Sequence, residues 1–235
     1  MRSRHRLMSL ATGLLGMVAT AALAAAPAAV PLEGTDYRLV AQAHRTLTPD
    51  KIEVVEFFSY ACPHCAVFYP LVAQWLTQQG KDVSFRRVPV GFNRAEWINL
   101  QRAFYALQTS GDFDKLDGPL FHAIHEEHQR LFDQGSIAEW VGKNGGNPDK
   151  FAGAYGSFGV NNQTVQADKM AEDYGIDSVP TIAIDGKYVA MADAAKGEAQ
   201  YLAELLGHAD MLIAKARAER PATRPPAKAT KPIRK

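Results

Sequence analysis

The residues with the clearest capacity for chemistry are the only two cysteines of this 235-residue chain, which stand three positions apart in Cys62-Pro63-His64-Cys65. A disulfide between them would close almost no loop, so it would add little chain-entropy stabilisation to a fold. Two thiols at this spacing are better suited to switching between a dithiol and a disulfide. We therefore predict that the Cys62–Cys65 pair is a redox-active disulfide.

The segment around the cysteines has the pattern of a strand followed by a helix. Lys51–Phe58 is rich in β-branched and aromatic residues and predicts a buried strand. After a turn at Ser59–Ala61, Pro63 suits the first turn of a helix, where its missing N–H would be unpaired in any case. Apolar residues at helical spacing then continue to about Gln79.

This setting gives the two thiols different roles. Cys62 would stand at the start of the helix, where unpaired N–H groups and the helix dipole favour a thiolate, the species that attacks a disulfide. His64 can add a positive charge or a hydrogen-bond donor beside it. Cys65 lies one turn deeper and is placed to resolve a mixed disulfide at Cys62.

Other uses of a Cys-x-x-Cys pair fit the sequence less well. A zinc site needs about four ligands, and the chain has no second cysteine pair. Covalent haem attachment needs a histidine directly after the second cysteine, where Ala66 stands. A purely structural pair is the remaining alternative. We predict no bound metal and no organic cofactor.

Glu56 is the most unusual acid of the sequence because it interrupts an apolar strand. Burial of a charge is costly, so either its face of the strand is exposed or it is a buried acid close to Cys65. Residues on both faces of the strand around it are apolar, which favours the buried acid.

The N-terminus has the layout of a secretory signal peptide, predicted over residues 1–26 with cleavage between 24 and 29. Arg2, Arg4 and Arg6 form a basic head, and Leu7–Ala26 has no charge and ends in small residues. No two arginines are adjacent there, which favours Sec-type over twin-arginine export. An uncleaved membrane anchor is the alternative.

The rest of the chain predicts a block of helices placed between strands. Helices are expected over Glu96–Ser110 and Phe113–His128, then from a capping box at Ser136, over Pro148–Tyr155, and from a cap at Asn161 or Asn162. Strands return at Thr181–Ile184 and Tyr188–Met191, joined by the turn signal Asp185-Gly186, and a helix over Gly197–Arg217 follows.

Charge divides the chain into an acidic body and a basic end. Residues 27–216 carry 16 Lys or Arg against 24 Asp or Glu. Residues 218–235 are rich in Pro, Ala, Lys and Arg and are predicted to be a disordered tail. We expect no nucleic-acid partner.

The stretch Glu-Phe-Phe-Ser-Tyr-Ala-Cys-Pro-His-Cys, residues 56–65, resembles the DsbA family of bacterial periplasmic disulfide oxidases. Ser178-Val179-Pro180-Thr181 is similar to the cis-proline loop of that family, so the resemblance implies that Val179 and Pro180 border a substrate groove. It also implies an α/β chain with a thioredoxin fold formed by 37–92 and 161–217, interrupted by a helical insertion at 93–160. Glu56 matches the family glutamate that is thought to shuttle protons.

Two positions depart from the family pattern. Tyr69 stands where the family often has another acid on the active-site helix, and Arg87 replaces a lysine of the following strand. Because arginine does not readily release a proton, the details of the family's charge network are not carried over.

We predict a periplasmic, monomeric thiol:disulfide oxidoreductase that donates its disulfide to newly exported proteins through a mixed disulfide at Cys62. By the resemblance, a DsbB-like membrane thiol oxidase would regenerate the disulfide. The alternatives are a disulfide isomerase or reductase, and a non-enzymatic module that handles metal ions with its two sulfurs.

Overall fold

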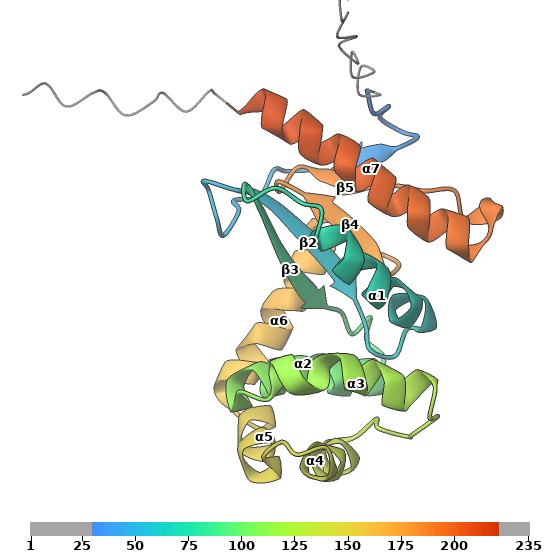
Figure 1. Ribbon diagram of the computed structural model, residues 1–235. Coiled ribbons are helices and arrows are strands. Elements are labelled where there is room, and N and C mark those ends of the chain that lie inside the picture. The colour runs from blue at the N-terminus through green and yellow to red at the C-terminus, as the bar shows by residue number, and fades with distance from the viewer. Residues whose placement is uncertain (1–29, 221–235) are drawn as a thin grey trace, which may run out of the picture.

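The computed structural model describes residues 30–220 (Figure 1). The predicted signal peptide, and the predicted tail beyond Arg220, lie outside the described residues. Among the helices of 30–220, none has both the length and the apolar character needed to cross a bilayer.

The described residues form one sheet and a set of helices. The strands are β1 (Tyr37–Leu39), β2 (Ile52–Phe58), β3 (Val83–Pro89), β4 (Thr181–Ile184) and β5 (Tyr188–Ala190). The helices are α1 (Pro63–Leu76), α2 (Ala95–Ser110), α3 (Phe113–His125), α4 (Gln134–Lys143), α5 (Pro148–Tyr155), α6 (Phe158–Asp173) and α7 (Glu198–Glu219), with a short 3-10 turn η1 (Ala194–Lys196). The predicted strands at Lys51–Phe58, Thr181–Ile184 and Tyr188–Met191 correspond to β2, β4 and β5, and the predicted helices follow them in the expected order.

The sheet has the order β1-β5-β4-β2-β3, in which β2 and β3 are parallel and the other neighbours are antiparallel. Helices α1 and α7 cover one face and α6 covers the other (Figure 1). Because strand side chains alternate, Val54, Glu56 and Phe58 of β2 point to the face of α1, whereas Val55 and Phe57 point to α6.

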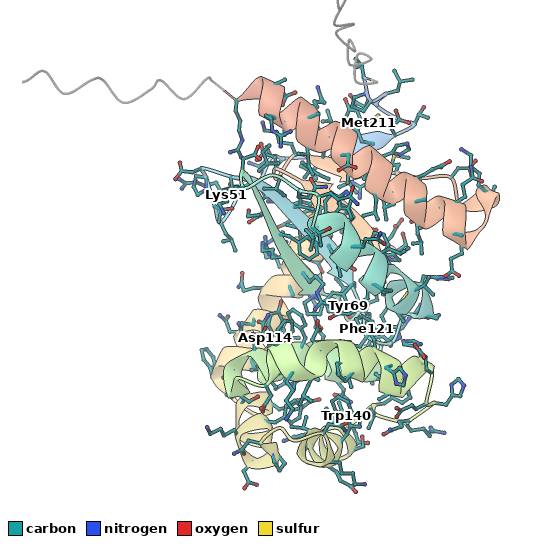
Figure 2. All side chains as sticks on the ribbon, in the orientation of Figure 1. Lys51, Tyr69, Asp114, Phe121, Trp140 and Met211 are labelled. Atoms are coloured by element: carbon teal, nitrogen blue, oxygen red, sulfur yellow. The ribbon has the colours of Figure 1, made fainter. Side chains whose placement is uncertain are left out.

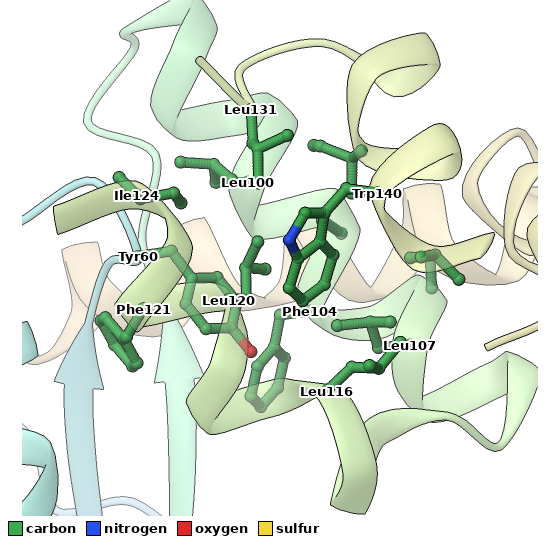
Figure 3. Packing of buried hydrophobic residues seen from close by; sticks show 14 of the residues in the cluster. Tyr60, Leu100, Phe104, Leu107, Leu116, Leu120, Phe121, Ile124, Leu131 and Trp140 are labelled. Carbon is green, nitrogen blue, oxygen red and sulfur yellow. The ribbon is translucent and has the colours of Figure 1, made fainter. Parts of the chain in front are cut away.

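Helices α2 to α5 form a block at one end of the sheet, between β3 and α6 (Figure 1). Their apolar side chains build a core that also takes in Phe58, Tyr60 and both cysteines. The ring of Tyr60 lies against Leu120 and Phe121 of α3 within this core (Figure 3). The turn before Cys62 and the start of α1, which carries both cysteines, are therefore packed directly against the insertion.

Two local features that the sequence predicted, the buried strand before the cysteines and the hairpin turn, are present in the structure. All seven residues of β2 are buried, as expected for a central strand without an exposed face. The hairpin turn predicted at Asp185-Gly186 joins β4 to β5, and both residues adopt positive φ, 53° and 69°. This conformation suits the right-handed twist of the two strands.

Several predicted helix ends were wrong. Helix α4 begins at Gln134 because Asp133 is its cap: the Asp133 side chain accepts from the Ser136 N–H, and Ser136 is the third helical residue. Helix α6 begins at Phe158, three residues before Asn161, because the Ser157 side chain accepts from the Val160 N–H. In both cases a residue earlier in the chain than the predicted cap accepts a backbone N–H with its side-chain oxygen and caps the helix.

Two helices also end at different positions from those predicted. Helix α3 stops at His125, and His128, which the sequence placed in the helix, has a positive φ of 55°. Helix α7 continues to Glu219, so Ala218 and Glu219 are helical and do not belong to the predicted tail.

Candidate active site

Cys62 occupies the cap position at the start of α1, directly after the turn that follows β2. Its backbone is extended, with φ −90° and ψ 118°, and Pro63 is the first helical residue, as predicted. No side chain caps this end of the helix, so the N–H groups of the first turn remain available to a charge on Cys62. Both cysteines are free thiols, so the structure describes the dithiol form.

The two sulfurs differ in access to solvent. Cys62 keeps 5% of its surface exposed, whereas Cys65 is fully buried at 0%. Cys62 is therefore the sulfur that a partner molecule can reach. Its sulfur lies 3.4 Å from the carbonyl oxygen of Val179, to which the protonated thiol can donate, and the Val179–Pro180 peptide bond is cis. The two residues predicted to border a substrate groove thus lie beside the accessible sulfur.

The surroundings of Cys62 favour its thiolate. A hydrogen bond from the Cys65 thiol is the main cause that lowers the pKa of Cys62 from 9.0 to about 6. The backbone N–H groups of Cys65 and His64 and the His64 charge act in the same direction, and burial opposes them. At neutral pH most of Cys62 is therefore ionised in the reduced protein.

Cys65 lies in the opposite situation. Burial is the main cause that raises the pKa of Cys65 well above 9.0, and its bond to Cys62 and the charges of Cys62 and Glu56 add to the effect. The second thiol therefore keeps its proton in the reduced form.

His64 has a partner that the sequence did not indicate. Its ring nitrogen Nδ1 bonds to the carboxylate of Glu198, the first residue of α7. This bond is the main cause that raises the pKa of His64, so the imidazole carries more positive charge near neutral pH. Both side chains are well exposed, so the pair is a surface interaction.

Glu56 is buried with 2% of its surface exposed, as its apolar neighbours indicated. Burial is the main cause that raises the pKa of Glu56 from 4.5 to about 7. Arg87 opposes this effect and Asp117 adds to it. One carboxyl oxygen, Oε2, has no hydrogen-bond partner among the described residues. The arrangement is that of an acid that can both hold and release a proton near pH 7.

A cavity of about 400 Å³ lies beneath α1, and Glu56, Tyr69, Arg87 and Asp117 are among its lining residues. Figure 2 shows Tyr69 where α1 meets the insertion, beside Phe121 of α3, and the two ring centres are 5.2 Å apart. This volume is ample for several water molecules, and Glu56, Arg87 and Asp117 in its lining offer them hydrogen-bond partners.

Two residues at the site, Asp117 and Glu198, were not predicted from the sequence. Asp117 is buried on α3, bonds to Arg87 and accepts from the Tyr60 hydroxyl at 2.5 Å. The sequence pattern could have indicated that Asp117 is buried, because it falls in the apolar stripe of α3, at helical spacing from Leu120 and Ile124. Glu198 had no such signal, because it lies 134 positions from His64. Among residues 30–220, no group of three or more His, Cys, Asp or Glu is arranged to hold a metal ion.

Comparison with known proteins agrees with this geometry. Residues 53–203 match the family model described as a DSBA-like thioredoxin domain. A thiol:disulfide interchange protein DsbA of Burkholderia cepacia is 37% identical over 180 residues, which cover 76% of this chain and 84% of that protein. The corresponding protein of Pseudomonas syringae pv. tomato is 36% identical over 194 residues, covering 82% of this chain and 88% of that one.

Solved structures show the same relationship. The crystal structure of Pseudomonas aeruginosa DsbA has a TM-score of 0.70 and 34% identity, and the match covers 79% of this chain and 94% of that one. The oxidoreductase DsbA from Xylella fastidiosa has a TM-score of 0.74, with 28% identity over 81% of this chain and 100% of that one. The predicted thioredoxin fold with its helical insertion is confirmed. The chain belongs to the DsbA family and is a thiol:disulfide oxidoreductase.

Proposed function

We propose that the protein works as an oxidase, which donates a Cys62–Cys65 disulfide to reduced, newly exported proteins. The observation that carries this direction is the lowered pKa of Cys62, about 6, at the start of α1. A lower thiolate pKa stabilises the reduced enzyme, and whatever stabilises the reduced form makes the disulfide a stronger oxidant.

The size of this effect follows from the two pKa values. A fall from 9.0 to about 6 stabilises the reduced form at pH 7 by about 1.4 kcal/mol, because below pH 6 the thiol is protonated in either case. For a two-electron couple this corresponds to about 30 mV. The contribution grows as the pH rises from 6 towards 9, so the potential should depend on pH most clearly in that window.

The reaction is a pair of thiol–disulfide exchanges. A substrate thiolate attacks the Cys62 sulfur, the Cys62–Cys65 bond breaks, and Cys65 leaves with the bonding electron pair and takes up a proton. The second substrate thiolate then attacks the substrate sulfur of the mixed disulfide, and Cys62 leaves as a thiolate. The substrate loses two electrons and two protons as its disulfide forms, and the enzyme gains the two electrons.

Residues around the pair are assigned supporting roles. Glu56, with a pKa of about 7, would give the proton to Cys65 as it leaves and take it back on reoxidation. Val179 and Pro180 would border the bound substrate, since the Val179 carbonyl lies 3.4 Å from the Cys62 sulfur. Pro63 begins the helix that favours the thiolate, and His64 adds positive charge beside it.

The location and the partners follow from the same assignment. Residues 1–26 would act as a Sec-type signal peptide and direct the chain to the periplasm, where disulfides persist. Reduced exported proteins would be the substrates, and a DsbB-like membrane thiol oxidase would restore the disulfide. Residues 37–92 and 161–217 would act as the catalytic unit, with 93–160 as its insertion and the chain beyond the end of α7 as a tail.

The redox equilibrium of the Cys62–Cys65 pair with glutathione tests the direction of the reaction. The expected result is a potential well above that of thioredoxin, about −270 mV, together with rapid oxidation of a reduced test protein. A potential as low as that of thioredoxin would contradict the oxidase assignment and favour a reductase. Rapid reshuffling of a scrambled test protein, without net oxidation, would favour an isomerase.

A further inference from the structure

We propose that Asp117, on helix α3 of the insertion, is a positioning residue of the redox centre: it engages Arg87 and thereby keeps Glu56 free of an ion pair. The inference rests on the proposed role of Glu56 as a proton donor and acceptor. It assigns to the insertion a part in the chemistry, in addition to its part in packing.

Arg87 has two acids within its surroundings and bonds to only one of them. In the parallel pairing of β2 and β3, Arg87 stands directly opposite Glu56, so both side chains point to the face of α1. A cross-strand ion pair between these two residues would be the ordinary outcome. Arg87 instead bonds to Asp117, and no ion pair joins it to Glu56 in the part of the chain that the structure describes.

The position of Arg87 is fixed from several sides. Its side chain is 8% exposed, and its guanidinium carbon lies 4.7 Å from the ring centre of Phe58 and 5.1 Å from that of Tyr69. Asp117 is fixed as well, because its second oxygen accepts from the Tyr60 hydroxyl at 2.5 Å. The two carboxylate oxygens of Asp117 thus accept from two donors, Tyr60 and Arg87. The guanidinium of Arg87 is therefore held at the insertion.

Glu56 and Arg87 each keep one buried polar atom without a hydrogen-bond partner among residues 30–220. The two atoms are Glu56 Oε2 and Arg87 Nη1, and both residues line the cavity of about 400 Å³. An acid that holds no ion pair and lines a cavity together with other polar side chains can exchange its proton with water in that cavity. The other titratable groups around Glu56 come from α1 and from the turn after β2: Cys65, Tyr69 and Tyr60.

Substitution of each charge should move the titration of Glu56 in a different direction. In Asp117→Asn, Arg87 loses its partner and acts on Glu56 alone, so the pKa of Glu56 should fall by about one unit. In Arg87→Gln, the cation that opposes the effect of burial is lost, so the pKa of Glu56 should rise. The measurement is a 13C NMR titration of the Glu56 carboxyl in the full reduced protein, with Glu56→Gln used to assign the signal. Opposite shifts are not expected from two variants that merely loosen the fold.

The control is Asp114→Asn, the same substitution three residues earlier on α3, at an exposed position (Figure 2). It should leave the Glu56 titration unchanged. If Asp117→Asn is too unstable to study, the double variant Asp117→Asn/Arg87→Gln, which leaves no buried unpaired cation, should show a raised pKa because Arg87 acts on Glu56 more strongly than Asp117 does. An unchanged or raised Glu56 pKa in Asp117→Asn, or a lowered one in the double variant, would overturn the inference.

Activity separates this inference from the proposed function. If the NMR shifts occur as expected but Glu56→Gln oxidises a test protein at the normal rate at every pH, the role of Asp117 stands and the catalytic role of Glu56 fails. If Glu56→Gln alters the pH profile but Asp117→Asn leaves the titration in place, the reverse holds.

Discussion

The two sulfurs of one helical turn lie in opposite surroundings. Cys62 lies at the start of α1, in a region that we call the rim and that comprises Cys62, His64 and Glu198. Backbone N–H groups, the Cys65 thiol and the charge of His64 lower the pKa of Cys62 to about 6. Cys65 stands in the interior beside Glu56, and burial raises its pKa well above 9.0. At neutral pH the reduced pair therefore holds one thiolate and one thiol.

This difference separates two tasks. The rim determines how well the reduced form is stabilised, and hence the direction of exchange. The interior determines how a proton reaches or leaves a sulfur that has no contact with solvent. The two thiols are coupled through their hydrogen bond, so a change at one is expected to appear at both. Substitutions that act on one region alone test whether the separation holds.

The largest expected effect comes from the cysteines themselves. Cys62→Ser should abolish oxidation of a reduced test protein, because no sulfur remains where a substrate can reach it. Cys65→Ser should instead accumulate mixed disulfides with substrate, since its hydroxyl can still donate to Cys62 but cannot displace a bound thiol. Non-reducing electrophoresis and mass spectrometry would detect these adducts.

A matched variant sharpens this comparison. Cys65→Ala removes the donor that contributes most to the lowered pKa of Cys62, so its Cys62 thiolate should form at a higher pH than in Cys65→Ser. The ultraviolet absorbance of the thiolate reports this titration. Equal titrations of the two variants would show that the Cys65 hydrogen bond is unimportant and that backbone donors dominate.

The next effect concerns the interior and is a change in stability. Folding raises the pKa of Glu56 from 4.5 to about 7. Below pH 4.5 this acid therefore does not lower the free energy of unfolding, whereas it lowers that free energy progressively more as the pH rises to 7. Glu56→Gln should therefore stabilise the protein above pH 7, by up to roughly 3 kcal/mol, and have little effect near pH 4. Urea unfolding at both pH values measures the difference.

Glu53 provides the control for this prediction, because it is a buried acid of the same strand on the opposite face. It pairs with Arg86 at 3.2 Å, so Glu53→Gln removes an ion pair and should destabilise the protein. A Glu56→Gln variant that loses stability at pH 8 in the same way would mean that Glu56 is paired when charged, contrary to the structure.

A smaller effect is expected at the rim. His64→Ala removes the imidazole but keeps the backbone N–H of residue 64, and the side-chain charge contributes less to the Cys62 pKa than the backbone does. The pKa of Cys62 should therefore rise by about one unit at most, and the equilibrium constant for oxidation of glutathione should fall by up to about tenfold. A much larger fall would mean that the imidazole, and not the helix start, controls the thiolate.

A feature could be predicted from the sequence where neighbouring residues determine it. It could not be predicted where residues far apart in the chain have to meet. The strand, the turn and the Cys62 cap position are local, and so is the apolar pattern that marks Glu56 as buried; all were predictable. The start of α6 was not, since Ser157 and Asn161 are competing caps and only packing decides between them. Asp117 meets Tyr60 across 57 positions, and no pattern within one segment indicates which charges will meet.

The smallest expected effect belongs to a contact of that long-range kind, between Glu198 of α7 and His64. Glu198→Gln keeps a hydrogen-bond acceptor but removes the charge, so the pKa of His64 should fall, as NMR titration of its ring protons would show. The pair is exposed, and Glu198 reaches Cys62 only through an imidazole whose own contribution is small. The glutathione equilibrium should then change by less than in His64→Ala. A larger change would mean that α7 acts on Cys62 by another route, such as displacement of the Val179 loop, and the rim would no longer be independent of the rest of the fold.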